Sequence, residues 1–400
     1  MTPIVAVDVG TTRIRAARWD ATGKCVQLAS YPAPAMCRRE GRAEQPVEAT
    51  LSAVDRAVAE VCGEDACVVA LTSQRGTTIL VDALDVPLTP IISWQDRRSG
   101  GIAAWFGEHA PSVAERTVRQ ASIASLLVHR WTGEWAEHAA TRAGASLGQP
   151  TREVDGPIGC SAGPFAAGSI LVAVGGDKNC ELVGAGATSP GRCAVSFGTA
   201  LSMGTLIASD SECTPGTFRT PSVSMGLDTI EVGLAAGGVM AERFGGPRSG
   251  VGLPPVGGVM CVPYFAGSLL NPAATGHFVG MDATVDVDQL YAAWLESLVL
   301  ELAVSSARLG RIEGPVGVCG GAATAQFAQW LSTAFQVDVL DFSDLECGLF
   351  GAAVLALECV EAPAANILPL EHRLVRPTND ARWSARLTRY SLLVGKTAPV

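Results

Sequence analysis

IVAVDVGTTRIRAARWD, residues Ile4 to Asp20, is the stretch on which the interpretation of the whole chain depends. Four apolar residues lead into Asp8, and a second strand-like run ends at Trp19 and Asp20. Gly10, Thr11 and Thr12 lie between the two runs, so the pattern predicts a strand, a tight turn and a second strand. Glycine allows the chain to reverse and to approach a ligand closely, and the threonines offer hydroxyl and backbone N–H groups to an anion.

Asp8 places a carboxylate at the mouth of this turn, where it could hold a hydrated Mg²⁺ ion. The same residues also suit an edge hairpin that binds nothing. The stretch alone leaves both interpretations open, and the rest of the chain has to decide between them.

Composition limits the class of protein. The chain has 400 residues, 48% of them hydrophobic and 17% charged, which predicts two folded domains and argues against disorder. Its net charge is −10 and it has no basic stripe, so we expect no nucleic-acid binding. The 12 cysteines form no C-x-x-C pair and the 5 histidines are dispersed. Buried reduced thiols in a cytoplasmic protein are therefore expected, and no histidine-rich metal site.

Targeting and membrane segments are not expected. A strand follows Met-Thr-Pro at once, without the basic and apolar segments of a secretory signal. The longest apolar helical stretch, Leu290 to Val304, is interrupted by Glu296 and Glu301, which argues against a membrane span.

Strand and helix patterns alternate along the chain, which is typical of an α/β fold. The apolar run Ile170 to Val174 leads into Gly175-Gly176-Asp177, and we expect a helix of small residues over 180–187. CAVSFGTA, residues Cys193 to Ala200, then repeats the apolar run, the glycine and the threonine of the first stretch, with Ser196 in the place of Asp8. This repeat predicts two domains of similar topology, each beginning with a phosphate-binding hairpin.

Further stretches support one interpretation. They are LTSQRGTTILVD with PLTPIISWQDRRS, VGGDKNCELVGAGATSPG, CGGAATAQFAQWLSTAF with GLFGAAVLA, and VRPTNDARWSARLTRY. Together with the two hairpins, and in this order, they resemble the FGGY carbohydrate kinases, whose members include glycerol kinase and xylulokinase. The resemblance covers nearly the whole chain.

This resemblance implies an actin-like (ribonuclease H-like) fold: a duplicated two-domain α/β ATPase with a central cleft. Residues 1–187 would form the N-terminal domain, on the sugar-binding side and with the catalytic aspartate. Residues 188–400 would form the C-terminal domain, on the ATP-binding side.

The resemblance also implies site residues. Asp177 would be the general base, although an aspartate here could also simply cap the next helix. Asp8 would orient Mg²⁺ through water, and the hairpins would bind the phosphates of ATP. The expected nucleotide-binding residues are Asp8, Gly10, Thr11, Thr12, Gly198, Thr199, Gly320, Gly321 and Ala322.

Arg75, Trp94 and Asp177 are the expected contacts of the substrate, although Trp94 could equally belong to the core. Asp96 either supports Arg75 or lies in a solvated Asp-Arg-Arg turn. The chain departs from glycerol kinases at Gly76, where they carry a glutamate, and from most family members at Lys178, where they carry a glutamine. It is also about a hundred residues short between Gly148 and Ile170, measured against the usual family length.

We therefore expect ATP-dependent phosphorylation of a hydroxyl on a sugar, ketose or polyol, with ATP and Mg²⁺ as cofactors. The alternative is a catalytically weakened nucleotide-binding regulator or scaffold of the same fold, which Gly76 and the shortening favour. The expected partner is a small-molecule sugar or polyol, without nucleic acid or membrane, in the cytoplasm. A homodimer is left open.

Overall fold

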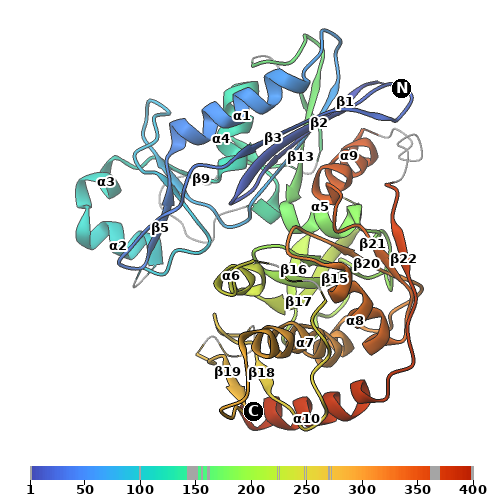
Figure 1. The fold of residues 1–400 in the computed structure, drawn as a ribbon. Helices are drawn as coiled ribbons and strands as arrows, with labels where there is room; N and C mark the ends of the chain where they lie inside the picture. Colours follow the sequence, from blue (N-terminus) through green and yellow to red (C-terminus); the bar gives the residue numbers. More distant parts are fainter. Residues whose placement is uncertain are drawn as a thin grey trace. The chain divides into compact units, whose positions relative to one another are not determined.

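The computed structural model describes residues 2–98, 101–141, 152–154, 156–159, 163–222, 224, 226–246, 248, 250–268, 271, 273–360 and 370–397. The chain divides into two compact units, and Figure 1 labels their helices and strands. The first consists of Met1–Cys180, Pro221–Met225 and Gly348–Pro369, and the second of the other residues. The first unit thus ends its main segment at Cys180, whereas the sequence interpretation placed the boundary after residue 187. The roles assigned to the two halves stay a prediction.

The first unit is built on a sheet with the strand order β12-β13-β6-β1-β2-β3. Strand β1 pairs antiparallel with β2 and parallel with β6, which in turn pairs parallel with β13. Every residue of β1 and β6 is buried, as expected for the central strands of a covered sheet. The strand bounds are β1 (Ile4–Val9), β2 (Arg13–Trp19), β3 (Cys25–Pro32), β6 (Val68–Ser73), β12 (Ile158–Gly159) and β13 (Ile170–Gly176).

Helices α1 (Val47–Val61) and α4 (Ile123–Thr132) pack against this sheet. Apolar residues at helical spacing form the buried stripe of α1, and Gly133, with φ of 79°, ends α4 in a left-handed turn. Gly148 and part of the segment after it lie outside the described residues. The other elements are β4 (Cys37–Arg39), β5 (Arg42–Gln45), β7 (Ile79–Val81), β8 (Ile91–Ile92), α2 (Gly101–His109), α3 (Pro111–Arg116), β9 (Arg119–Ala121), β10 (Ala136–Glu137), η1 (Ala139–Thr141), β11 (Arg152–Glu153) and α9 (Cys347–Cys359).

The second unit repeats the core of the first. Its sheet has the order β16-β17-β15-β14-β20-β21-β22, in which β14 pairs antiparallel with β15 and parallel with β20. The run β17-β15-β14-β20-β21 therefore matches β3-β2-β1-β6-β13 in order and direction. The duplication that the two hairpins predicted is present in the topology. The strand bounds are β14 (Ala194–Phe197), β15 (Leu201–Ala208), β16 (Phe218–Pro221), β17 (Leu227–Leu234), β20 (Val316–Cys319), β21 (Val339–Asp341) and β22 (Arg373–Val375).

Helices α7 (Val287–Ser305), α8 (Ala325–Phe335) and α10 (Arg382–Thr397) pack together in this unit (Figure 1). Asp286 and Gln289 cap α7 reciprocally, each side chain bonding the other's backbone N–H. The remaining elements are α5 (Asp177–Gly184), which crosses the division of the chain, α6 (Gly237–Arg243), β18 (Met260–Val262), β19 (His277–Val279) and η2 (Ser306–Leu309).

Helix α7 is the central helix of the second unit. Together with η2 it forms the one segment of the described chain that is long and apolar enough to cross a membrane, by length and composition alone. However, 78% of its most apolar window is buried inside the protein, which is typical of a core helix. Glu296 and Glu301, which the sequence interpretation took as interruptions, are among its buried residues.

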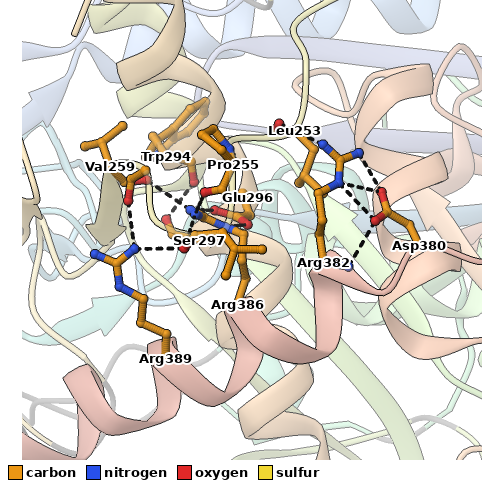
Figure 2. Close-up of polar contacts among 12 residues, drawn as sticks. Leu253, Pro255, Val259, Trp294, Glu296, Ser297, Asp380, Arg382, Arg386 and Arg389 are labelled. Carbon is orange, nitrogen blue, oxygen red and sulfur yellow. Dashed lines mark hydrogen bonds and ion pairs between the residues drawn. The ribbon is translucent and has the colours of Figure 1, made fainter. Parts of the chain in front are cut away.

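Helix α10 supplies a partner to each of the two buried glutamates (Figure 2 shows the first of them). Arg386 binds both carboxylate oxygens of Glu296 and donates to the carbonyls of Pro255 and Val259. Tyr390 donates to Glu301, as does Tyr264, over distances of 2.6 and 3.0 Å. Burial raises the pKa of both phenols, so each hydroxyl keeps its proton and remains a donor.

We predict that Arg386→Met destabilises the folded chain by about 3–5 kcal/mol, because it leaves the carboxylate of Glu296 buried without its cation. The matched control is Arg382→Met, on the same helix. Arg382 pairs with Asp380 at side-chain exposures of 47% and 25%, so its loss should cost at most about 1 kcal/mol. Urea unfolding of both variants measures the difference, and equal losses would contradict the prediction.

The loss of unfolding free energy caused by Arg386→Met should also depend on pH. Burial already raises the pKa of the Glu296 carboxyl above its ordinary value, and Arg386 opposes this rise. Without Arg386 the folded chain takes up a proton at Glu296 more readily than the unfolded chain does. The free energy of unfolding of the variant should therefore approach that of the wild type as the pH falls.

Candidate functional site

The first hairpin turns tightly at Gly10. Its N–H donates to the carbonyl of Arg13 over 3.0 Å, and a Cβ at Gly10 would lie 2.9 Å from that carbonyl oxygen. The φ angle of Gly10 is not positive. The sequence interpretation expected glycine to let the chain reverse here. The reversal does not use the left-handed backbone that glycine permits, and close contact with the carbonyl of Arg13 is what excludes a side chain.

Asp8 lies near the end of β1 and is 5% exposed. Its Oδ2 is 3.5 Å from Nη1 of Arg15, its partner in the register of β1 and β2. Beyond it in the turn, the hydroxyl of Thr11 donates to Oε1 of Gln74 over 3.1 Å, and Thr12 is exposed. The hairpin therefore combines one buried carboxylate with a turn whose backbone lies near the surface.

The ends of three parallel strands meet beside this hairpin. In register, Asp8 lies opposite Thr72 of β6, and Ser73 lies opposite Gly176 of β13. Because the strands are parallel, their carboxyl ends share one edge of the sheet, which is where ligands bind in open α/β sheets.

Asp177 is the first residue of α5, and its Oδ1 accepts a hydrogen bond of 2.9 Å from the N–H of Lys178. The helix predicted over 180–187 in fact spans Asp177–Gly184. The expectation was wrong by three residues at its start, because β13 passes into the helix without a separate loop. Asp177 is thus fixed by regular structure on both sides.

Two glycines let other groups pack against the chain just before Asp177. Gly175 has φ of 103°, and its carbonyl accepts a 3.0 Å hydrogen bond from the hydroxyl of Thr72. A Cβ at Gly176 would lie only 2.1 Å from Cγ of Arg75. The stem of Arg75 therefore lies directly on the backbone beside Asp177, so the structure brings these two predicted site residues together.

Trp94 packs against Gly76, the residue that follows Arg75 in the chain. Gly76 has φ of 66°, and a Cβ there would be 3.4 Å from Cβ of Trp94. Trp94 is half-buried, so it is not a core residue. The left-handed backbone favours glycine at this position, and a glutamate would be strained.

Asp96 follows neither of the two alternatives that the sequence left open. Its side chain is 5% exposed, binds the guanidinium of Arg98 with both oxygens and accepts from the N–H of Ala43. Burial raises the pKa of the Asp96 carboxyl, but Arg98 and the backbone N–H groups lower it more, so the pKa lies below its ordinary value. Arg98 also lies 4.7 Å over the ring of Trp105. Asp96 therefore anchors its own loop.

The second hairpin has a similar tight turn, in which the N–H of Gly198 donates to the carbonyl of Ala200 over 3.0 Å. The carbonyl of Gly198 accepts from Gly238 over 2.9 Å, and that of Thr199 accepts from Val239 over 3.5 Å. A Cβ at Gly238 would lie 2.3 Å from the carbonyl oxygen of Gly198. The start of α6 is thus packed on the hairpin. The sequence interpretation did not include Gly238. The adjacent glycines Gly237 and Gly238 could have indicated a close approach of two backbones there.

The loop after β20 packs on the same hairpin. Gly320 has φ of 102°, and a Cβ there would be 2.6 Å from the carbonyl carbon of Phe197. Ala322 donates its N–H to the carbonyl of Phe197 over 2.9 Å. A Cβ at Gly321, in contrast, would meet nothing within 4 Å. The predicted residues of the second unit therefore form one cluster, with open space at Gly321.

The two hairpins differ at the position of Asp8, because only the first hairpin carries a carboxylate there. Ser196, which replaces Asp8 in the second hairpin, donates its hydroxyl to Oε2 of Glu181 on α5. Among the described residues there is no group of three or more histidine, cysteine, aspartate or glutamate side chains that could hold a metal ion.

Several known proteins resemble this chain in sequence. Residues 3–104 match the N-terminal domain of the FGGY family of carbohydrate kinases. Glycerol kinase 1 of Saccharolobus solfataricus is 33% identical over 108 residues, which cover 26% of this chain and 22% of that protein. The match thus spans about a fifth of the length of that relative. The glycerol kinase of Alkalilimnicola ehrlichii is 27% identical over 506 positions, covering 98% of this chain and 96% of that protein. With 506 positions against 400 residues, that alignment leaves gaps in this chain.

Solved structures share the fold. Gluconate kinase from Lactobacillus acidophilus is similar with a TM-score of 0.82 at 16% identity, over 98% of this chain and 97% of that one. Glycerol kinase from Plasmodium falciparum with ADP is similar with a TM-score of 0.76 at 14% identity, over 100% and 99%. The fold is therefore the actin-like α/β fold that the sequence blocks implied. The N-terminal segment of this chain thus matches the FGGY family of carbohydrate kinases, and a full-length glycerol kinase relative and the fold agree with that match.

Proposed function

We propose that this protein transfers the γ-phosphoryl group of ATP to a hydroxyl of a sugar, ketose or polyol. The observation that carries the proposal is the contact between Arg75 and Gly176. It joins a cation at the end of β6 to the chain that bears Asp177 at the end of β13, on the sheet edge that also carries the first hairpin.

Asp177 acts as the general base. A sugar hydroxyl is a weak nucleophile, so a carboxylate within hydrogen-bond reach accepts its proton while the hydroxyl oxygen attacks phosphorus. The hydrogen bond from the N–H of Lys178 to Oδ1 orients the carboxylate at the start of α5.

Gly10, Thr11 and Thr12 in one unit and Gly198 and Thr199 in the other bind the phosphates of ATP through their backbone N–H groups. Gly320, Gly321 and Ala322 bind the adenosine, for which the open space at Gly321 leaves room. Asp8 orients Mg²⁺ through water, and the ion neutralises phosphate charge. The glycerol kinase with ADP among the similar structures supports the choice of nucleotide.

Arg75 and Trp94 bind the acceptor. The guanidinium donates to a hydroxyl or another oxygen of the acceptor, and the half-buried indole covers its carbon backbone. Gly76 offers no side chain to the acceptor, and its left-handed backbone disfavours the glutamate of glycerol kinases. A longer or acidic acceptor suits this site better than glycerol.

Replacement of the base gives the first test. Asp177→Asn should lower kcat by about 10²–10⁴-fold, because asparagine cannot accept the proton. The affinity for MgADP and the thermal midpoint should stay near those of the wild type, since the amide still accepts from Lys178. A variant with more than about a third of the wild-type kcat would refute the assignment.

Filling the open space in the second unit gives another test. Gly321→Val should raise the KM for ATP by about tenfold or more, a loss of about 1.4 kcal/mol, because the added side chain takes up room assigned to the nucleotide. Gly252→Val is the matched control, since a Cβ at Gly252 also meets nothing within 4 Å. If both variants leave the KM for ATP unchanged, the nucleotide does not lie at Gly321.

Acceptor choice can be measured through ADP release with glycerol, pentuloses, heptuloses and sugar acids. Glycerol should be the poorer substrate by about tenfold to a hundredfold in kcat/KM, because one charged hydrogen bond, about 1.5–3 kcal/mol, is missing at Gly76. Glycerol as the best substrate would show that another residue supplies this carboxylate. Tight MgADP binding without turnover on any acceptor would instead favour a nucleotide-binding regulator.

A further inference from the structure

A closed ring of hydrogen bonds joins the first hairpin to the residue that precedes Arg75. The hydroxyl of Thr11 donates to Oε1 of Gln74 over 3.1 Å. Nε2 of Gln74 donates to Oε1 of Gln45 over 3.2 Å, and Nε2 of Gln45 returns to the carbonyl of Thr11 over 3.1 Å. Three residues from three separate segments thus close one circuit.

The ring has a single possible direction. Gln45 and Gln74 are both 2% exposed, so the amide groups find their partners within the protein. Nε2 of Gln45 also donates to the carbonyl of Pro34 over 2.6 Å. If the amide of Gln45 were turned over, its oxygen would face the carbonyls of both Thr11 and Pro34. That arrangement leaves acceptors against acceptors, and the donation sequence around the ring is therefore fixed.

This direction determines what Thr11 can offer a phosphate. Its hydroxyl proton is used on Gln74, so the hydroxyl presents lone pairs to other partners. A phosphate oxygen is itself an acceptor and would be repelled by them. Thr11 therefore serves a phosphate through its backbone N–H while the ring is closed.

The ring also determines where Arg75 lies. The backbone N–H of Gln74 donates to the carbonyl of Val9 over 3.0 Å, so both the main chain and the side chain of Gln74 are held by the hairpin. The next residue, Arg75, places its stem on Gly176, which precedes Asp177. A path of contacts thus runs from the hairpin to Gly176, the residue before Asp177.

We propose that Gln45 and Gln74 are positioning residues that couple a nucleotide phosphate at the hairpin to the acceptor-binding Arg75 and to Asp177. This inference rests on the proposed function. When a phosphate fixes the turn at Thr11, the ring restrains Gln74, and the segment 72–78 becomes ordered around the acceptor. Neither glutamine touches the reacting atoms, and each acts through Thr11 or Arg75.

The test uses the full chain and the magnesium complex of an ATP analogue with a nitrogen bridge between its β- and γ-phosphates, which resists hydrolysis. Hydrogen exchange of segment 72–78 is measured with and without the analogue. In the wild type, bound analogue should slow the exchange about fivefold or more. In Gln45→Met and Gln74→Met the ratio of bound to free exchange should approach one, although calorimetry still detects binding.

Two further variants separate coupling from stability. Gln120→Met removes another buried glutamine of the first unit, which lies outside the ring, and should keep the wild-type ratio. Thr11→Val opens the ring, so the ratio of bound to free exchange should approach one. Thr11→Ser retains the hydroxyl and should show the wild-type ratio. A purely structural role would speed exchange equally with and without the analogue and leave the ratio unchanged.

The outcomes are distinct. Ring variants that bind the analogue and still protect segment 72–78 as the wild type does would overturn the inference. A wild-type chain that does not bind the analogue would instead overturn the proposed function, and the inference with it. If both glutamine variants fail to fold, the comparison of Thr11→Val with Thr11→Ser decides the question alone.

Discussion

The parallel pairing of β1, β6 and β13 is the constraint on which the proposed site depends. It places the carboxyl ends of three strands that are far apart in sequence on one edge of the sheet. Asp8, Arg75 and Asp177 each lie at or just beyond one of these ends. A slip of one residue in either pairing would turn the side chains of a strand to the opposite face, so the buried strands also fix the site.

Glycines convert this shared edge into direct contact. Gly176 admits the stem of Arg75, Gly238 admits the carbonyl of Gly198, and Gly320 admits the backbone of Phe197. In each case a Cβ would come within 2.6 Å of the neighbouring atom, closer than side chains approach. Both units therefore place a glycine, whether in a strand, a helix or a loop, where a second segment lies against its backbone. Packing against a neighbouring segment therefore contributes to the position of each of these glycines.

The sequence predicted those features that depend on short-range pattern. The strand, glycine and threonine pattern located both hairpins, and the run before Asp177 located its strand. The partner of Asp96 could not be predicted, because Arg98 binds it while lying over the ring of Trp105, an arrangement that exists only in the folded chain. Glu296 is a similar case. In sequence it interrupts an apolar helix, but Arg386, 90 positions later, makes its burial possible. Such pairs leave no periodic signal, since charged residues at these spacings usually lie on a solvated face.

The two halves share a topology but differ in the chemistry of their hairpins. In the first, the carboxylate of Asp8 lies on β1 itself and is paired with Arg15. In the second, Ser196 takes that place and donates to Glu181, one helical turn after Asp177 on α5. A neutral hydroxyl at the second turn places no negative charge on the strand beside the polyphosphate that is proposed to bind there. The carboxylate on α5 is instead occupied with the hydroxyl of Ser196. The duplication therefore supplied two similar scaffolds, and Asp8 has no carboxylate counterpart on the strand of the second hairpin, which is why the metal-orienting role is proposed for Asp8.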